Sequence, residues 1–139
     1  MRFTSSLDSN YAVQLLQALA SVQKQQQYHE RIAVAVNGRI LLVDTKDIEW
    51  IEADRNSVRL HLGTLVYELR NTLSNIESKL NPKQFTRIHR STLVNVSKIM
   101  EIHPWFHGHH KVLLRSGQEL RMSRHQSKSA RILLGGLNQ

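Results

Sequence analysis

Phe85-Thr-Arg-Ile-His-Arg-Ser-Thr-Leu-Val-Asn-Val96 places a basic and polar cluster directly against an apolar run. Arg87, His89, Arg90 and Ser91 form the cluster, and we expect their side chains to be exposed. The segment is too polar for a buried strand alone and too regular for a linker. It predicts short strands near residues 87–88 and 92–96, joined by a polar turn over 88–91.

Positive charge is concentrated around this segment. Residues 85–131 carry nine Lys and Arg against two Asp and Glu, whereas residues 1–84 carry ten against nine, within a formal net charge of +8. Localised positive charge repels itself unless a polyanion binds to it, which favours nucleic acid or an anionic membrane surface as the partner. The basic half reads as strands and not as an amphipathic helix, so nucleic acid is the better candidate.

The length and composition of the chain limit the class of protein. A chain of 139 residues can form one domain with an appendage. The absence of cysteine excludes disulfides, thiolate zinc sites and cysteine nucleophiles. No apolar run approaches the roughly 20 residues of a membrane span, and residues 1–7 lack an export signal. We therefore expect a soluble, cytoplasmic protein.

The sequence on either side of the opening stretch also reads as short strands separated by turn residues. Asn37-Gly38 between two apolar runs is typical of a tight hairpin, since both residues tolerate positive φ angles. Alternation in Val58-Arg-Leu-His-Leu62 predicts a strand with one buried face and one wet face. The further strands expected from such patterns cover residues 32–36, 39–44, 48–53, 57–62, 65–70, 99–103, 111–115 and 119–122.

Helices are expected in three places. Apolar side chains at three-to-four spacing over residues 11–27 predict an amphipathic helix, with a short dimerising coil as the alternative. Thr72 can cap a short helix over 73–80, and a closing helix is expected over 129–134. Because the strand connections are short, the sheets should be antiparallel. The expected fold is mainly β, with elongated antiparallel sheets and two short helices over 30–136, preceded by an N-terminal linker helix over 1–29.

Three polar turns combine the side chains that protein–DNA contacts use. They are Asp54-Arg-Asn-Ser57, Ile88-His-Arg-Ser91 and Ser123-Arg-His-Gln126. Arg can bind guanine bidentately and Asn can bind adenine, whereas Ser, His and backbone N–H groups suit phosphate oxygens. One such turn is typical of any solvated surface, but three in one chain favour a DNA-binding function.

Several sequence blocks follow a recognisable order across residues 32–134. They are Ile48-Glu-Trp-Ile-Glu-Ala53 followed by Asn56, then Arg70-Asn-Thr-Leu73, then Phe85-x-Arg-Ile-His-Arg-Ser91 with Leu93-Val-Asn95, and finally Leu114-x-x-Gly117 leading to Ser123-Arg124. This order resembles the LytTR-type DNA-binding domain, the output domain of many bacterial response regulators.

The resemblance implies loops that enter successive major grooves of DNA, commonly at paired direct repeats in promoters. It implies base contacts from Asn56-Ser57, from Arg90 and from Arg124-His125. Ser57 stands where the family often has an aromatic residue, and His125 where it more often has Arg or Lys. The phosphate candidates are Arg87, Lys98, Arg121 and Lys128. The complete set expected to contact DNA is Arg55, Asn56, Ser57, Arg87, His89, Arg90, Ser91, Lys98, Arg121, Arg124, His125 and Lys128.

A histidine-rich turn suggests a second kind of site, one that binds a metal ion. His107-Gly-His-His110, with His103 before it, could bind a transition-metal ion, because neutral imidazole is a common ligand. The run contains no carboxylate, and such turns more often form solvated hairpin tips, so we predict no metal site. We expect the neighbouring Trp105-Phe106 pair to pack across the core or to support the DNA-facing loops.

Catalysis is not indicated by the sequence. Strand alternation puts Glu52 and Asp54 on one face and Glu49 on the other, so these carboxylates do not converge. No nucleophile elbow or phosphate-binding glycine loop is present. We predict a protein that is not an enzyme and needs no cofactor.

The sequence therefore predicts a transcription regulator that binds double-stranded DNA specifically, as the output domain of a two-component response regulator. The phosphoacceptor domain of such a regulator is expected to precede this chain, and a free-standing form is the alternative. A homodimer on DNA is left open. The alternative function is a protein interaction module whose basic face binds an acidic partner. RNA binding is disfavoured, because no strand carries an aromatic pair that could stack bases.

Overall fold

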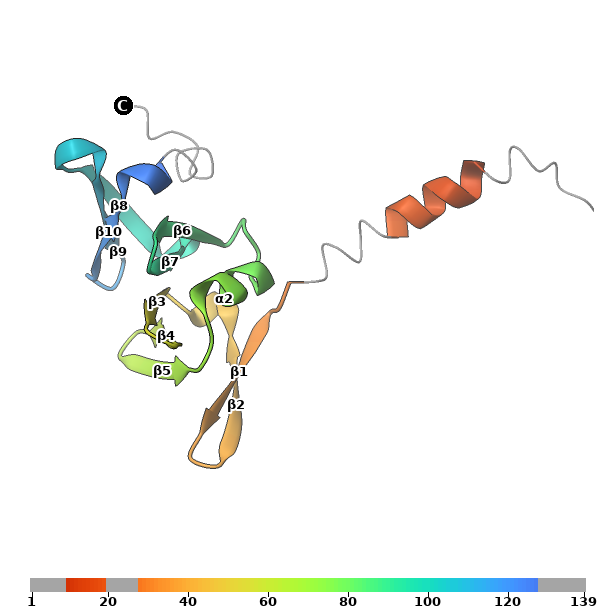
Figure 1. Ribbon diagram of the computed structural model, residues 1–139, viewed down its shortest axis with the longest axis horizontal. Coiled ribbons are helices and arrows are strands. Elements are labelled where there is room, and N and C mark those ends of the chain that lie inside the picture. The colour runs from red at the N-terminus through yellow and green to blue at the C-terminus, as the bar shows by residue number, and fades with distance from the viewer. Residues whose placement is uncertain (1–9, 20–27, 128–139) are drawn as a thin grey trace, which may run out of the picture.

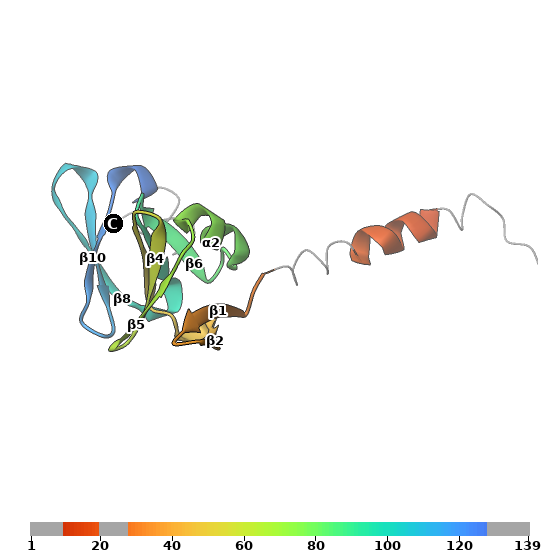
Figure 2. The ribbon, with the colours of Figure 1, turned by 60° about the horizontal axis from the view of Figure 1, so that its bottom comes forward.

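The fold consists of three antiparallel sheets stacked in a row. The computed structural model describes residues 10–19 and 28–127. A two-stranded sheet and helix α2 (Leu73–Lys79) lie on one side of a central five-stranded sheet, and a three-stranded sheet lies on the other (Figures 1 and 2). Two buried apolar clusters fill the spaces between these layers. The expected mainly β, antiparallel fold is confirmed.

The first sheet is a hairpin of β1 (Arg31–Val36) and β2 (Arg39–Asp44). Asn37 and Gly38 take φ angles of 50° and 79°, so the predicted tight turn forms. Ile32 and Val34 face inward and join the first core. A 3₁₀ turn, Thr45–Asp47, leads to the central sheet.

The central sheet has the strand order β5-β4-β3-β7-β6. Its last strand in sequence, β7, is buried on both faces: Leu93 belongs to the first core and Val94 to the second. On β4 the face that carries Arg59 and His61 is only partly covered, and these side chains stay 42% and 17% exposed, on the face that alternation predicted. The bounds are β3 Trp50–Asp54, β4 Ser57–Leu62, β5 Leu65–Leu69, β6 Phe85–His89 and β7 Thr92–Asn95.

Helix α2 (Leu73–Lys79) crosses from β5 to β6 and covers the first core. The Thr72 hydroxyl accepts a hydrogen bond from the Asn75 backbone N–H at 3.1 Å, which is the expected N-terminal cap. Leu73 and Ile76 are buried beneath the helix. The helix therefore begins and packs as its sequence predicts.

The third sheet supplies the second core. It consists of β8 (Ile99–Pro104), β9 (His110–Leu114) and β10 (Glu119–Met122), preceded by the 3₁₀ turn Val96–Lys98. A second 3₁₀ turn, Phe106–Gly108, joins β8 to β9. Inward side chains of β9 and β10 pack against β6 and β7; they are Val112, Leu114, Leu120 and Met122.

The ends of the described chain differ from the sequence prediction. An N-terminal helix occupies residues 10–19, and the rest of the predicted 11–27 helix lies outside the described residues. A C-terminal helix begins at residue 124 and continues to residue 127, earlier than the closing helix expected over 129–134, a range outside the described residues. The third predicted polar turn is thus the first turn of a helix. Ser123 directly precedes the first helical residue, and serine is common at this position of a helix. The sequence analysis interpreted the same residue as part of a loop.

Candidate nucleic-acid interface

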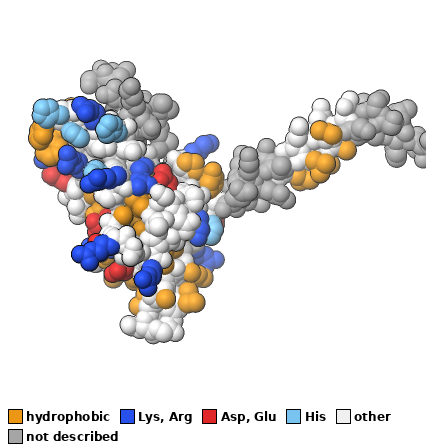
Figure 3. Space-filling model, in the orientation of Figure 1, with side chains coloured by type: hydrophobic (Ala, Val, Ile, Leu, Met, Phe, Trp, Pro, Cys, Tyr) orange, Lys and Arg blue, Asp and Glu red, His pale blue; other side chains and the backbone are white. Residues whose placement is uncertain are grey.

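The three polar segments meet at one edge of the molecule. The β3–β4 turn lies beside the β6–β7 turn, because the Ala53 N–H donates to the Ser91 carbonyl oxygen at 2.9 Å. The segment after β10 joins them, because the Ser123 N–H donates to the Ile88 carbonyl oxygen at 2.8 Å. We call these three segments the basic edge. In Figure 3, Lys, Arg and His side chains gather along the left side of the body.

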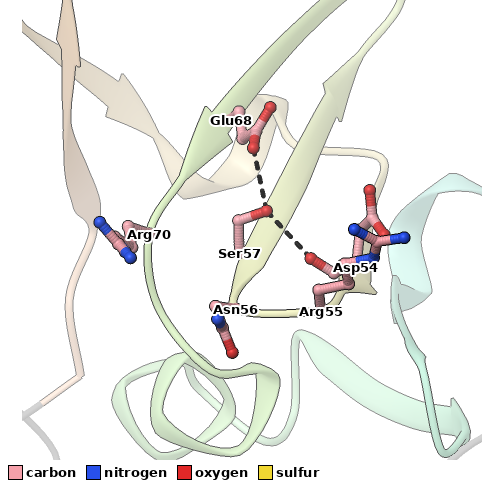
Figure 4. Close-up of a pocket in the computed structure, with 6 residues that line it drawn as sticks. All are labelled: Asp54, Arg55, Asn56, Ser57, Glu68 and Arg70. Carbon is pink, nitrogen blue, oxygen red and sulfur yellow. Dashed lines mark hydrogen bonds between the residues drawn. The ribbon is translucent and has the colours of Figure 1, made fainter.

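The β3–β4 turn presents Arg55 and Asn56 to solvent. The Ser57 hydroxyl lies within hydrogen-bonding distance of the Asp54 carbonyl oxygen (3.1 Å) and the Glu68 carboxylate (3.0 Å). Ser57 is partly buried, and these contacts stabilise the turn from its inner side (Figure 4). The turn borders an open hollow of about 530 Å³.

Arg70 is a basic residue beside the β3–β4 turn, and the sequence analysis named it only as part of a motif. It lines the hollow from the end of β5, across from Asn56 (Figure 4). The antiparallel register pairs Val58 with Leu69, which brings Arg70 beside Ser57. The sequence could have predicted this position of Arg70, because pairing the two strands across the Gly63-Thr64 turn places it beside Ser57.

The backbone of the β3–β4 turn is strained at an exposed basic residue. Arg55 has a φ angle of 59°, in the left-handed region that costs a non-glycine residue about 1–2 kcal/mol. Residues strained in this way cluster at functional sites, which makes Arg55 a candidate for a functional role. Arg55 therefore combines an unfavourable backbone with an exposed guanidinium.

Replacing Arg55 with glycine should raise the free energy of unfolding by about 1 kcal/mol, because glycine adopts positive φ without a steric penalty. The same change should weaken DNA binding by removing a cation from the basic edge. Urea denaturation and a DNA titration measure the two effects. Arg39→Gly is the control: it removes an exposed Arg from a strand with ordinary φ and should lower stability. If Arg55→Gly also lowers it, the strain is not relieved.

The β6–β7 turn is held together by Arg87. Its Nε donates to the His89 carbonyl oxygen at 3.0 Å, and its other nitrogens bond to the Arg90 carbonyl oxygen and to the Glu77 carboxylate, the latter at 2.8 Å. Only 21% of the Arg87 side chain is exposed. The expectation that all four side chains of this cluster are exposed is thus wrong: Arg90 is exposed, whereas Arg87, His89 and Ser91 are partly buried. Arg87 turns inward because α2 supplies a carboxylate that the local sequence does not reveal.

Arg90 stands at the tip of this turn. Its side chain is exposed, and among the described residues no hydrogen bond or ion pair involves its guanidinium. Its backbone is fixed through the Arg87 contact. Arg90 is therefore a rigidly mounted cation whose donors are available to a ligand.

His89 is a neutral side chain behind the same turn. Its Nδ1 accepts hydrogen bonds from the Ser91 N–H at 3.2 Å and from the Ser91 hydroxyl at 2.9 Å. Partial burial lowers the pKa of His89 below 6.5, and the nearby cations Arg121, Arg90 and Arg87, with His109, lower it further. The His89 proton therefore resides on Nε2, which can donate to a ligand.

Stability should fall as the pH drops below about 6.5, because the unfolded chain then binds protons that folded His89 resists. At higher pH both states are neutral at this site and the effect disappears. His109, whose pKa is lowered by burial and by Arg121 and Arg124, acts in the same direction. Urea midpoints between pH 7.5 and 5 test this. His89→Asn keeps an acceptor without titrating, so its pH dependence should be shallower; an identical pH profile would contradict the assignment.

Arg124 and His125 lie on the exposed first turn of the C-terminal helix. The N–H groups of Gln126 and Ser127 donate to the Ser123 carbonyl oxygen at 3.1 and 3.2 Å. This helical turn fixes the direction in which Arg124 and His125 leave the backbone. Lys128, the last residue expected to contact DNA, lies outside the described residues.

The β8–β9 turn supports Arg124. The Arg124 N–H donates to His109 Nδ1 at 3.2 Å. Gly108 packs so closely that an added Cβ would lie 3.0 Å from Arg124 Cδ, and its φ angle is 78°. The histidine-rich turn is thus a support for the basic edge, and no group of three metal-binding side chains occurs within the part of the chain that the structure describes.

Trp105 and Phe106 do not enter the core. They are 36% and 57% exposed, and the second core is filled by other side chains. Lys111 Nζ lies 4.9 Å from the Trp105 ring centroid, and the Arg121 guanidinium carbon lies 5.8 Å from it. The expectation of core packing is wrong, because β8 ends at Pro104 and the tryptophan follows outside the sheet. The alternative expectation, support for the polar segments, is consistent with this position.

Two cations from the sequence analysis have different positions. Arg121 is exposed on β10 and close enough to His89 to lower its pKa, so it belongs to the basic edge. Lys98 follows β7 at the end away from Arg90, where its carbonyl oxygen accepts from the Arg115 N–H at 2.9 Å. The structure therefore groups Arg55, Asn56, His89, Arg90, Arg121, Arg124 and His125, and places Lys98 apart from them.

The carboxylates of β3 are engaged with basic side chains. Arg59 lies 2.6 Å from Asp54 and 3.7 Å from Glu52. His61 contacts the same Glu52 oxygen at 2.9 Å and stacks on Trp50 with ring centroids 3.9 Å apart. These contacts form a side-chain network across the sheet.

None of the helices within the described ranges has the length and apolar character of a membrane span.

Comparisons with known proteins identify the family. Residues 38–135 match the LytTR family, described as the LytTr DNA-binding domain. The chain is 34% identical over 116 residues to the sensory transduction protein LytT of Bacillus subtilis, covering 81% of this chain and 48% of the relative. It is 25% identical over 135 residues to the transcriptional regulatory protein LytR of Staphylococcus aureus, covering 97% of this chain and 53% of the relative.

A solved structure shares the fold. It is the LytTr DNA-binding domain of a methyl-accepting/DNA response regulator from Bacillus cereus, with a TM-score of 0.71 and 23% identity. The match covers 78% of this chain and 99% of the solved one. The present chain spans about half the length of the relatives that it matches in sequence. On the family match, this chain belongs to the LytTR family of DNA-binding domains.

Proposed function

We propose that the basic edge binds one face of a DNA duplex and reads sequence through the major groove. The observation that carries this is the convergence of three separate segments, each with exposed cations, at one edge. A major groove about 12 Å wide admits secondary-structure elements, and short turns can enter it in the same way. In this arrangement Arg55-Asn56, Arg90 and Arg124-His125 contact bases, while Arg121 contacts phosphate.

The regulatory role is proposed from the relatives. Those named above are a sensory transduction protein and a transcriptional regulatory protein, each about twice as long as this chain. We therefore infer that this domain is the output part of a response regulator and that a phosphoacceptor domain accompanies it. Promoter direct repeats would accommodate two copies side by side. The proposed activity is binding alone, without catalysis or a cofactor.

Salt dependence separates a phosphate contact from a remote cation. Arg121→Gln should weaken binding to all duplexes alike and reduce the slope of log affinity against log salt by about one unit. Lys98→Gln should leave that slope unchanged, because Lys98 lies away from the basic edge. Gel-shift titrations at several salt concentrations measure both slopes. Equal slopes for the two variants would contradict the proposed docking face. A bound acidic protein that promoter DNA fails to displace would favour the interaction-module function.

A further inference from the structure

The N-terminal helix exposes an apolar face that no described strand covers. Tyr11, Leu15, Leu16 and Leu19 recur along one side of residues 10–19, and their exposed fractions are 49% or more. Residues 10–19 contain no charged side chain. In Figures 1 and 2 this helix stands clear of the three sheets. An isolated helix of this length is only marginally stable in water, so it needs a packing partner.

The β1–β2 hairpin exposes a second apolar face. Its outward side chains form two cross-strand pairs, Ala33 with Leu42 and Ala35 with Ile40. Ile40 is 70% exposed and Leu42 is 60% exposed, although the opposite face of the hairpin packs in the first core. Apolar side chains are visible on the surface near the hairpin in Figure 3. Within the described part of the chain, the hairpin is thus a thin layer that is covered on one side only.

A hollow extends this face toward the core. It has a volume of about 280 Å³ and lies where the hairpin meets β5 and α2. Its apolar lining consists of Ile32, Ala33, Leu42, Leu69 and Ile76, and its polar lining of His29, Arg31, Asn71 and Lys79. An apolar side chain from a covering element could enter the hollow and bury further surface. The outward apolar side chains of the hairpin continue into this hollow, and we call the two together the hairpin face.

We propose that the N-terminal helix docks on the hairpin face of its own chain. The helix is about 15 Å long, and the six-residue strands of the hairpin extend about 20 Å, so the two surfaces match in length. The chain between residue 19 and Arg31 can span at most about 40 Å, which is ample for the helix to fold back. An uncharged helix suits this apolar surface better than it suits an anionic partner.

The helix of the same chain is the favoured occupant because it is tethered. A short tether gives an effective concentration of about millimolar, whereas a second copy in a dilute sample is present at micromolar concentration. Docking of the attached helix therefore wins over pairing of two copies under those conditions. None of the residues involved belongs to the basic edge, so this docking and the proposed DNA contacts can fail independently.

Disulfide trapping in the full chain tests the docking, since the natural sequence contains no cysteine. Leu16→Cys with Leu42→Cys pairs the apolar side of the helix with the hairpin face. Gln17→Cys with Leu42→Cys is the control, because Gln17 lies on the opposite side of the helix. Under mild oxidation at micromolar protein, the first pair should form an intramolecular disulfide about ten times faster than the control. Equal rates, or disulfide-linked dimers that increase with concentration, would overturn the proposal.

Hydrogen exchange provides a second test that needs no cross-link. Leu42→Glu places a charge on the hairpin face at a position outside the core, and should speed exchange of the amides of residues 10–19 about tenfold. Leu65→Glu changes another exposed leucine, on β5, and should leave those amides protected as in the natural chain. If the amides of residues 10–19 exchange at the same rate in all three proteins, the helix is not docked.

Discussion

Arg90→Ala should cost about 1–3 kcal/mol of DNA-binding free energy and should relax the base preference at one position of the target. The guanidinium is exposed, its backbone is bonded to Arg87, and no ion pair within the described residues competes for it. The fixed backbone positions the side chain without any internal bond that must break first, so the only ordering cost is that of the Arg90 side chain itself, about 0.5–1.5 kcal/mol.

The measurement is selection from a randomised duplex library followed by gel-shift titration of the selected target at one salt concentration. Arg115→Ala is the matched control, because it removes the same exposed charge from the turn near Lys98, away from the basic edge. Equal losses for the two variants, or an unchanged base preference in Arg90→Ala, would contradict a base-reading role for Arg90.

Arg87→Ala should lower the free energy of unfolding by about 2 kcal/mol, since hydrogen bonds that involve a charged group contribute about 1.5–3 kcal/mol. The variant removes the bonds to the His89 and Arg90 carbonyl oxygens and the ion pair with Glu77. DNA affinity should fall as well, because the Arg90 turn loses its support. The salt slope of binding should nevertheless stay unchanged, because Arg87 is engaged inside the protein.

Urea denaturation and salt titrations of the same Arg87→Ala sample provide both quantities. Glu77→Gln is the informative partner variant: it removes only the ion pair, of which the carboxylate is 44% exposed, and should cost less than about 1 kcal/mol. If Arg87→Ala instead keeps full stability and reduces the salt slope by about one unit, Arg87 contacts phosphate, as the sequence alone indicated.

The sequence predicted those elements that local chemistry determines. Asn37-Gly38 favours positive φ angles, Thr72 favours the start of a helix, and the apolar alternation of β4 favours one buried face. Such signals act over a few residues and are readable without the rest of the fold. The antiparallel sheets follow from the short connections between these elements.

The arrangement of the site depends on contacts that are distant in sequence. Arg87 faces inward because Glu77 lies on the helix that crosses over from β5. Lys98 lies away from Arg90 because β7 runs from one end of the sheet to the other between them. The charge of a basic residue can therefore be predicted from the sequence, whereas the direction of its side chain is known only from the packed structure.

The central claim is that three segments of one edge meet the same duplex. This claim needs Asn56, Arg90 and Arg124 to face the same side of the protein, and the backbone bonds at Ala53 and Ser123 hold their three segments next to one another. Had these side chains occupied opposite surfaces, no single duplex could have contacted them all.

The most direct test is an NMR titration of the full chain with a selected duplex, following every backbone amide. We predict that the amides of Arg55, Asn56, Arg90 and Arg124 shift together and saturate at the same DNA ratio, while those of residues 115–118 stay unchanged. Shifts concentrated at 115–118 and Lys98, or confined to one of the three segments, would contradict the account.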